Sequence, residues 1–208
     1  MRKAIISVAV ATTLLTGCMS NVPSASGPSN DPQKATLLMT VGEGWGLQSG
    51  QAYVVLKNEN TGRFTKLLSE TDSRGGAGSA DFVESAYRAF EFNAEAVDPG
   101  TYTLSTWGFE MRRGSATKRA SKSVKIEAGK VYYLGSLFAN NLTQTARIEN
   151  KLAGERRAYM SKYPELKTRG IEDVSSSFSV KCWKMDVSDE IAREDTTSLL
   201  RDAIKNCS

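Results

Sequence analysis

The ten residues 88–97, RAFEFNAEAV, carry the clearest fold signal in this chain. Apolar and polar side chains alternate with a period of two, which places successive residues on opposite faces of a strand. One face would carry Phe90, Phe92, Ala94 and Ala96, and the other Glu91, Asn93 and Glu95. The segment therefore predicts a half-buried β-strand, with one face in the core and one in water.

Similar patterns recur on both sides of this segment. Further strands are expected at residues 36–41, 52–57, 63–68, 102–106, 124–126 and 131–138. Short polar turns such as 98–100, Asp-Pro-Gly, separate several of them, which favours antiparallel neighbours. The sequence therefore predicts a mainly β fold, an antiparallel β-sandwich of about seven strands over residues 35–147.

Two stretches within this region carry a family resemblance. Residues 97–104 read VDPGTYTL, and residues 124–134 read VKIEAGKVYYL. Together they resemble the sequence pattern of transthyretin-like or carboxypeptidase-regulatory-like β-sandwich domains of uncharacterised type. The resemblance implies a non-catalytic accessory or binding role, and it carries over no ligand site.

The last third of the chain changes period. Ile148, Leu152, Tyr159 and Tyr163 form an apolar stripe at helical spacing, with Lys151, Glu155 and Arg157 outside it, and Pro164 ends the run. A second helix is expected over residues 189–205, with Ile191, Leu199, Leu200, Ala203 and Ile204 facing inward, and one more strand between the helices, near Phe178, Val180 and Trp183. Residues 148–208 are thus expected to form a helical extension packed on the sandwich.

The N-terminus has the pattern of an export signal. Arg2 and Lys3 precede an apolar run over residues 4–15, which is too short to span a bilayer comfortably. Residues 15–18, Leu-Thr-Gly-Cys, resemble the lipobox of bacterial lipoproteins, which implies cleavage after residue 17 and lipidation of Cys18. The alternative is an ordinary secretory signal with an incidental cysteine. Met19, where inner-membrane retention usually calls for Asp, points to the outer membrane of a diderm host.

Residues 18–34 are expected to act as a tether. After Cys18 they are rich in serine and proline and contain almost no apolar side chains. Such a segment cannot bury enough surface to offset its ordering entropy. A lipidated cysteine and a flexible linker would thus hold the folded part close to the membrane.

Two further cysteines, Cys182 and Cys207, remain after lipidation. In an oxidising compartment two such thiols form a disulfide more readily than they stay free, although two free thiols are the alternative. A metal site is not expected from two distant cysteines in a chain without histidine.

The composition argues against most catalytic sites. The absence of histidine excludes Ser-His and Cys-His nucleophilic sites within this chain. Enzyme alternatives are Ser115 with Lys118, or carboxylate pairs such as Glu70 with Asp72 and Asp189 with Glu194, although solvated faces explain the carboxylates better. No catalytic residue, cofactor or metal is predicted.

The strongest surface feature of the sequence is basic. Residues 112–125 contain six cations and no acid: Arg112, Arg113, Lys118, Arg119, Lys122 and Lys125. This basic segment would contact an anionic surface, or it is a solvated loop that keeps the protein soluble.

Trp45 lies among glycines, where an exposed ring would contact a sugar or a partner and a packed ring would not.

These features predict a lipid-anchored, non-catalytic binding or scaffolding module of the cell envelope, facing the periplasm or the cell surface. Expected partners are the membrane, through the lipid, and an envelope protein, lipopolysaccharide or peptidoglycan. Without Arg2 and Lys3, 25 of the 27 basic residues remain against 23 acidic ones, a net charge of +2. So slight an excess gives no reason to expect a nucleic-acid partner.

Overall fold

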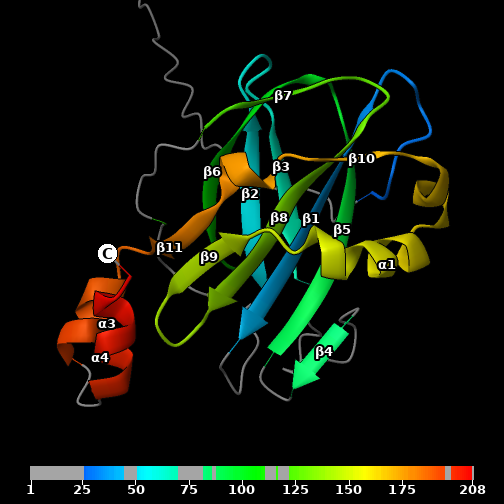
Figure 1. The fold of residues 1–208 in the computed structure, drawn as a ribbon. Coiled ribbons are helices and arrows are strands. Elements are labelled where there is room, and N and C mark those ends of the chain that lie inside the picture. The colour runs from blue at the N-terminus through cyan, green and yellow to red at the C-terminus, as the bar shows by residue number, and fades with distance from the viewer. Residues whose placement is uncertain are drawn as a thin grey trace, which may run out of the picture.

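The computed structural model describes residues 26–44, 51–69, 82–85, 88–110, 116, 122–194 and 198–207. Two β-sheets face each other, the first helix lies against the outside of the larger sheet, and the last two helices lie beyond one of its edges (Figure 1). The strands are β1 (Ala35–Gly44), β2 (Ala52–Asn58), β3 (Phe64–Leu68), β4 (Phe82–Ser85), β5 (Arg88–Val97), β6 (Gly100–Phe109), β7 (Val124–Ile126), β8 (Val131–Asn140), β9 (Thr145–Glu149), β10 (Ile171–Asp173) and β11 (Val180–Lys184). The helices are α1 (Leu152–Lys162), the 3-10 helix η1 (Pro164–Thr168), α2 (Ser175–Phe178), α3 (Ser188–Glu194) and α4 (Ser198–Lys205).

The larger sheet has seven strands and the smaller one four. The order in the larger sheet is β11-β9-β8-β1-β5-β4, with β10 also paired to β8, and the order in the smaller sheet is β3-β2-β6-β7. The prediction of a mainly β, sandwich-like fold with a C-terminal helical part is confirmed.

The sequence predicts an antiparallel sheet, but the larger sheet also contains parallel pairs. β8 runs parallel to β1, with Thr36 opposite Val131, and β10 runs parallel to β8. The reason is connectivity, since β8 follows β7 of the smaller sheet and so reaches β1 by a crossover and not by a hairpin. Gly135, with φ of 120°, lies where the register between β1 and β8 shifts.

β5 has the bounds that the alternation predicts, but it is not half-buried. Phe92 and Ala94 are buried on one face, as expected. Glu91 and Asn93 on the alternate positions are also only 5% and 4% exposed. The expectation of a solvated face is wrong here because the smaller sheet approaches that side, where Asn93 Nδ2 donates to the carbonyl of Leu68 in β3 at 2.9 Å.

The turn between β5 and β6 is fastened from several directions. The Tyr102 hydroxyl donates to the carbonyl of Asp98 at 2.7 Å. The Asp98 carboxylate pairs with Lys34 at 2.5 Å and with Arg63 at 3.2 Å. The hydrogen bond from Lys34, with the charge of Arg63 beside it, holds the pKa of Asp98 below its usual range.

Residues 26–34, which the sequence assigns to the linker, lie against the domain. Gly27 N donates to the carbonyl of Ala94 at 3.0 Å, beside β5. Arg169, just after η1, donates to the carbonyl of Ser29 at 2.9 Å and to Thr36 Oγ1 at 3.3 Å. In Figure 1 this blue segment lies beside the chain of η1. The stretch between Cys18 and the first docked residue, Ser26, is therefore shorter than the expected linker.

The C-terminal part contains two strands, β10 and β11, besides the expected helices. The boundary expected at residue 147 falls inside β9, and β10 and β11 join the larger sheet. Two helices, α3 and α4, replace the single one expected over 189–205, and Leu199 is 82% exposed rather than inward-facing. Phe178 ends α2, so the predicted strand starts only at Val180.

Candidate functional site

The outer face of the larger sheet is covered by α1 and η1. Asn150 Oδ1 accepts a hydrogen bond from Leu152 N at 3.0 Å where α1 begins, and Pro164 then starts η1. Tyr159 is fully buried on the sheet, with Leu152 and Tyr163 partly buried beside it. The predicted stripe is therefore correct for these three residues, whereas Ile148 belongs to β9.

A polar network lies beneath this cover. Glu155 Oε2 accepts hydrogen bonds from Thr40 Oγ1 at 2.7 Å and from the Tyr133 hydroxyl at 2.8 Å. The Tyr159 hydroxyl lies 3.0 Å from Thr40 Oγ1. Glu155 was expected on the solvated side of α1. It instead shares the buried face, because it follows Leu152 by three residues and precedes Tyr159 by four.

The chemistry of this network favours a structural role. Burial, and then the charge of Glu155, raise the pKa of Tyr133. Burial is also the main reason why the pKa of Tyr159 lies well above its ordinary value. Both phenols are therefore neutral hydrogen-bonding groups near pH 7 rather than bases. The network fastens α1 to β1 and β8.

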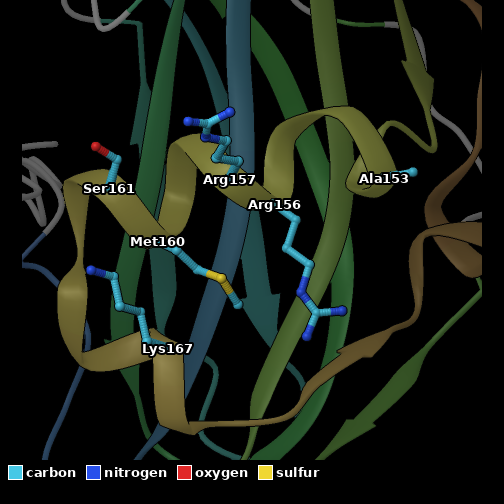
Figure 2. A pocket seen from close by; sticks show the side chains of 6 residues that line it. All are labelled: Ala153, Arg156, Arg157, Met160, Ser161 and Lys167. Carbon is cyan, nitrogen blue, oxygen red and sulfur yellow. The ribbon is translucent and has the colours of Figure 1, made fainter.

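The opposite side of α1 forms a cationic groove. The groove has a volume of about 620 Å³ and is lined by Ala153, Arg156, Arg157, Met160 and Ser161 of α1 and by Lys167 of η1. Figure 2 shows these side chains on α1 and on the turn of chain below it. The five α1 positions recur at spacings of three, one, three and one, which keeps them on one side of a helix. The described residues that line the groove include three cations and no acid, so its chemistry suits an anion.

Only part of the predicted basic segment can be located. Arg112, Arg113, Lys118 and Arg119 lie outside the described residues, as do Trp45 and Cys18. Lys122 and Lys125 are exposed, and Lys125 Nζ lies 3.4 Å from Glu127. Ala116, inside the same segment, forms a β-bridge with Met185 and packs against the core. At that position the chain is attached to the domain and is not a free loop.

Cys182 and Cys207 are joined by a disulfide, with their Cα atoms 5.1 Å apart. Cys182 lies in β11 and Cys207 follows α4. The bond therefore ties the end of α4 to the edge of the larger sheet.

Most residues of the enzyme alternatives lie outside the part of the chain that the structure describes. Ser115, Lys118, Glu70 and Asp72 lie outside the described residues, as does the side chain of Glu194. Asp189 pairs with Lys184 at 3.0 Å. Within the described ranges, no three carboxylate or thiol side chains gather as metal ligands, and no helix has the length and apolarity to cross a membrane.

The sequence reasoning missed the groove. It placed Arg157 on the outer side of the helix but did not consider Arg156, Met160 or Lys167. A helical projection of residues 153–161 would have grouped the two arginines with Met160. Lys167 could not be assigned to this group from the sequence, because only the turn at Pro164 folds η1 back beside α1.

Comparison with known proteins identifies no relative that would assign a function. No family model matches the chain, and no curated protein matches it. Among solved structures, a leucine-rich repeat protein from Bacteroides thetaiotaomicron VPI-5482 is similar over 62% of this chain and 16% of its own, with 10% sequence identity and a TM-score of 0.29. This chain thus corresponds to a small share of that protein's length, and a likeness this weak carries no argument about fold or function.

Proposed function

We propose that this chain is a lipid-anchored, non-catalytic binding module of the cell envelope, held through Cys18 to the outer membrane of a diderm host. The transthyretin-like resemblance of residues 97–134 favours the same kind of accessory role. The observation that carries the proposal is the short distance along the chain from Cys18 to the folded domain. Ser26, eight residues later, already donates its backbone N–H to the Glu95 carboxylate at 2.5 Å.

The reach of this connection follows from chain geometry. Eight residues span at most about 28 Å when fully extended. Two or three acyl chains on the cysteine would make anchoring effectively permanent, since a single chain binds only marginally. The domain would then work next to the membrane surface, where its partner is an envelope protein, lipopolysaccharide, peptidoglycan or the membrane itself.

The binding role is favoured over an enzyme by how the buried polar groups are used. Thr40, Tyr133, Tyr159 and Glu155 bond to one another, and Asn93 bonds to the facing sheet. These contacts serve the packing of α1 and of the two sheets. An envelope enzyme that uses carboxylates, or Ser115 with Lys118, is the alternative; a loss of hydrolytic activity on replacing those residues would favour it.

The anchor is tested by mass spectrometry of the mature protein from its own host. The expected N-terminal residue is Cys18 carrying acyl chains, and Cys18→Ser should leave the precursor uncleaved and without lipid. Thiol labelling of the unreduced, denatured protein should find neither Cys182 nor Cys207 free. An unmodified mature N-terminus in the wild-type protein would refute the anchor.

A further inference from the structure

We propose that the groove between α1 and η1 binds phosphate groups of anionic lipid headgroups in the membrane that holds the anchor. This inference rests on the proposed function, because the lipid anchor supplies the membrane. It concerns a surface other than the basic segment 112–125.

The charge of the groove is the first argument. Arg156, Arg157 and Lys167 are exposed, and no carboxylate among the described residues lies within ion-pair distance of them. Residues 151–169 contain six cations and two acids, a net charge of +4, which equals that of the whole 208-residue chain. The cover of the larger sheet is therefore a second cation-rich stretch of the chain, besides residues 112–125.

The other cations of this cover are already engaged. Lys162 pairs with Glu91, and Lys151 lies 3.8 Å from Glu149. Arg169 donates to backbone carbonyls, including that of Gly129 at 3.1 Å. The three groove cations instead face solvent, and Figure 2 shows Arg156 and Arg157 extending to different sides of α1. A guanidinium offers paired N–H donors that match phosphate oxygens, so each arginine can hold a phosphate group, and Lys167 adds a third positive charge.

The position of the tether is the second argument. Arg169, two residues after Lys167, holds the carbonyl of Ser29 on the outer face of the larger sheet. The chain from Cys18 first meets the domain at β5, where Ser26 and Gly27 bond to Glu95 and Ala94, and it reaches the cover of α1 and η1 three residues later, at Ser29. Since the connection to Ser26 spans at most about 28 Å, the groove would stay close to the headgroups around the anchor. Partly buried Met160 between the cations provides an apolar floor suited to a membrane interface.

The size of the effect follows from the number of cations. Each Lys or Arg near an anionic membrane surface strengthens binding roughly fivefold at low salt, so the three together should contribute about a hundredfold. The attraction should weaken steeply as salt shortens the screening length.

The test uses the mature chain from residue 18 onward with Cys18→Ser, so that binding cannot come from acyl chains. Its affinity is measured for vesicles containing phosphatidylglycerol and for vesicles of phosphatidylcholine alone. The groove variant combines Arg156→Glu, Arg157→Glu and Lys167→Glu. A matched control combines Lys181→Glu, Arg193→Glu and Lys205→Glu, which makes the same change in net charge at exposed positions on β11, α3 and α4. Thermal melting of each variant verifies the fold.

The expected result is selective binding to the anionic vesicles, lowered at least about a hundredfold in the groove variant, because each substitution reverses a charge, and several-fold at most in the control. Equal loss in both variants would show that only net charge matters and would overturn the proposal, as would unchanged binding of the groove variant. Displacement from vesicles by inorganic phosphate, well beyond that by chloride at the same ionic strength, would assign the groove to a small phosphate instead. Because the protein carries no lipid, these outcomes are independent of whether Cys18 is acylated in the host, which mass spectrometry decides separately.

Discussion

The two faces of the seven-stranded sheet are covered in different ways. The inner face packs on the four-stranded sheet through apolar side chains such as Met39, Leu137 and the fully buried Trp107. The outer face packs under α1 and η1, where Phe92 and Tyr159 form an edge contact with ring centroids 5.2 Å apart. Beside this contact lies the hydrogen-bonded network of Glu155, so the outer cover combines an apolar contact with directional polar contacts to one helix.

The hydrogen-bonded network of Glu155 explains how α1, a helix rich in charge, is oriented on the sheet. Apolar contact is non-directional and would allow α1 to rotate about its axis. The hydrogen bonds from Thr40 and Tyr133 to Glu155 specify one rotation, and that rotation turns Arg156 and Arg157 to the solvent. The buried network thus positions the cationic groove without being part of it.

The largest effect is expected on the inner face. Trp107→Ala should lower the free energy of unfolding by about 3–5 kcal/mol, because it leaves a large cavity between the sheets. Denaturant unfolding measures this loss. Trp107→Phe is the control and should cost much less, since it keeps a ring beside Phe109 and removes an indole N–H for which the structure gives no hydrogen-bond partner. Equal losses for the two variants would contradict a cavity-dominated cost.

A smaller loss is expected on the outer face. Glu155→Ala should lower the free energy of unfolding by roughly 1–3 kcal/mol, because the hydroxyls of Thr40 and Tyr133 lose their acceptor. The same denaturant series measures it. Arg156→Ala, on the solvated side of α1, is the matched control and should change stability by less than about 0.5 kcal/mol. If both variants behave alike, the network does not hold the helix.

The third effect is a loss of unfolding free energy at alkaline pH, through Tyr159 on the outer face. Because the folded-state pKa of Tyr159 lies above its ordinary value of about 10, its stabilising contribution is full below pH 10 and is lost as pH rises further. The loss should reach about 1.4 kcal/mol per pH unit for each such tyrosine. Unfolding free energies measured from pH 9 to about pH 11 should therefore fall less steeply in Tyr159→Phe than in the wild type. Identical slopes would argue that Tyr159 ionises freely.

The smallest effect is expected where the N-terminal segment meets the sheet edge. The lowered pKa of Asp98 means that its pairing with Lys34 stabilises the fold above the ordinary carboxyl range and is lost as pH falls through the folded-state pKa. Acid should therefore lower the hydrogen-exchange protection factor of the Gly129 N–H, which donates to the carbonyl of Lys34 at 2.7 Å. Asp98→Asn should remove most of this acid response. An equally steep response in that variant would assign it to another group.

Local periodicity accounts for what could be predicted of the fold. The period of two over residues 88–97 identified β5 with its observed bounds, since alternation is a property of adjacent residues. The solvated face expected for these alternate positions failed because distant segments reach them: Leu68 of β3, 25 residues away, bonds to Asn93, and Lys162, 71 residues away, pairs with Glu91. The expectation for Glu155 was wrong for the same reason, because its partners are far away in the sequence. A charged residue is assigned to water by default, and its partner Thr40 lies 115 residues away.

The fold and the candidate site both combine features that local sequence determines with features that only tertiary structure determines. The sequence alone indicated the strand segments other than β4, β9 and β10, and the apolar stripe of Leu152, Tyr159 and Tyr163, because each depends on short-range pattern. It favoured pairing of Cys182 with Cys207 over two free thiols. The export signal and the lipobox resemblance are also properties of the sequence, and they stay predictions. Tertiary structure decided the parallel pairing of β1 with β8, the burial of Glu155, and the meeting of Arg156 with Lys167 in one groove. These depend on which distant segments become neighbours, and only packing the whole chain determines which charges remain in water.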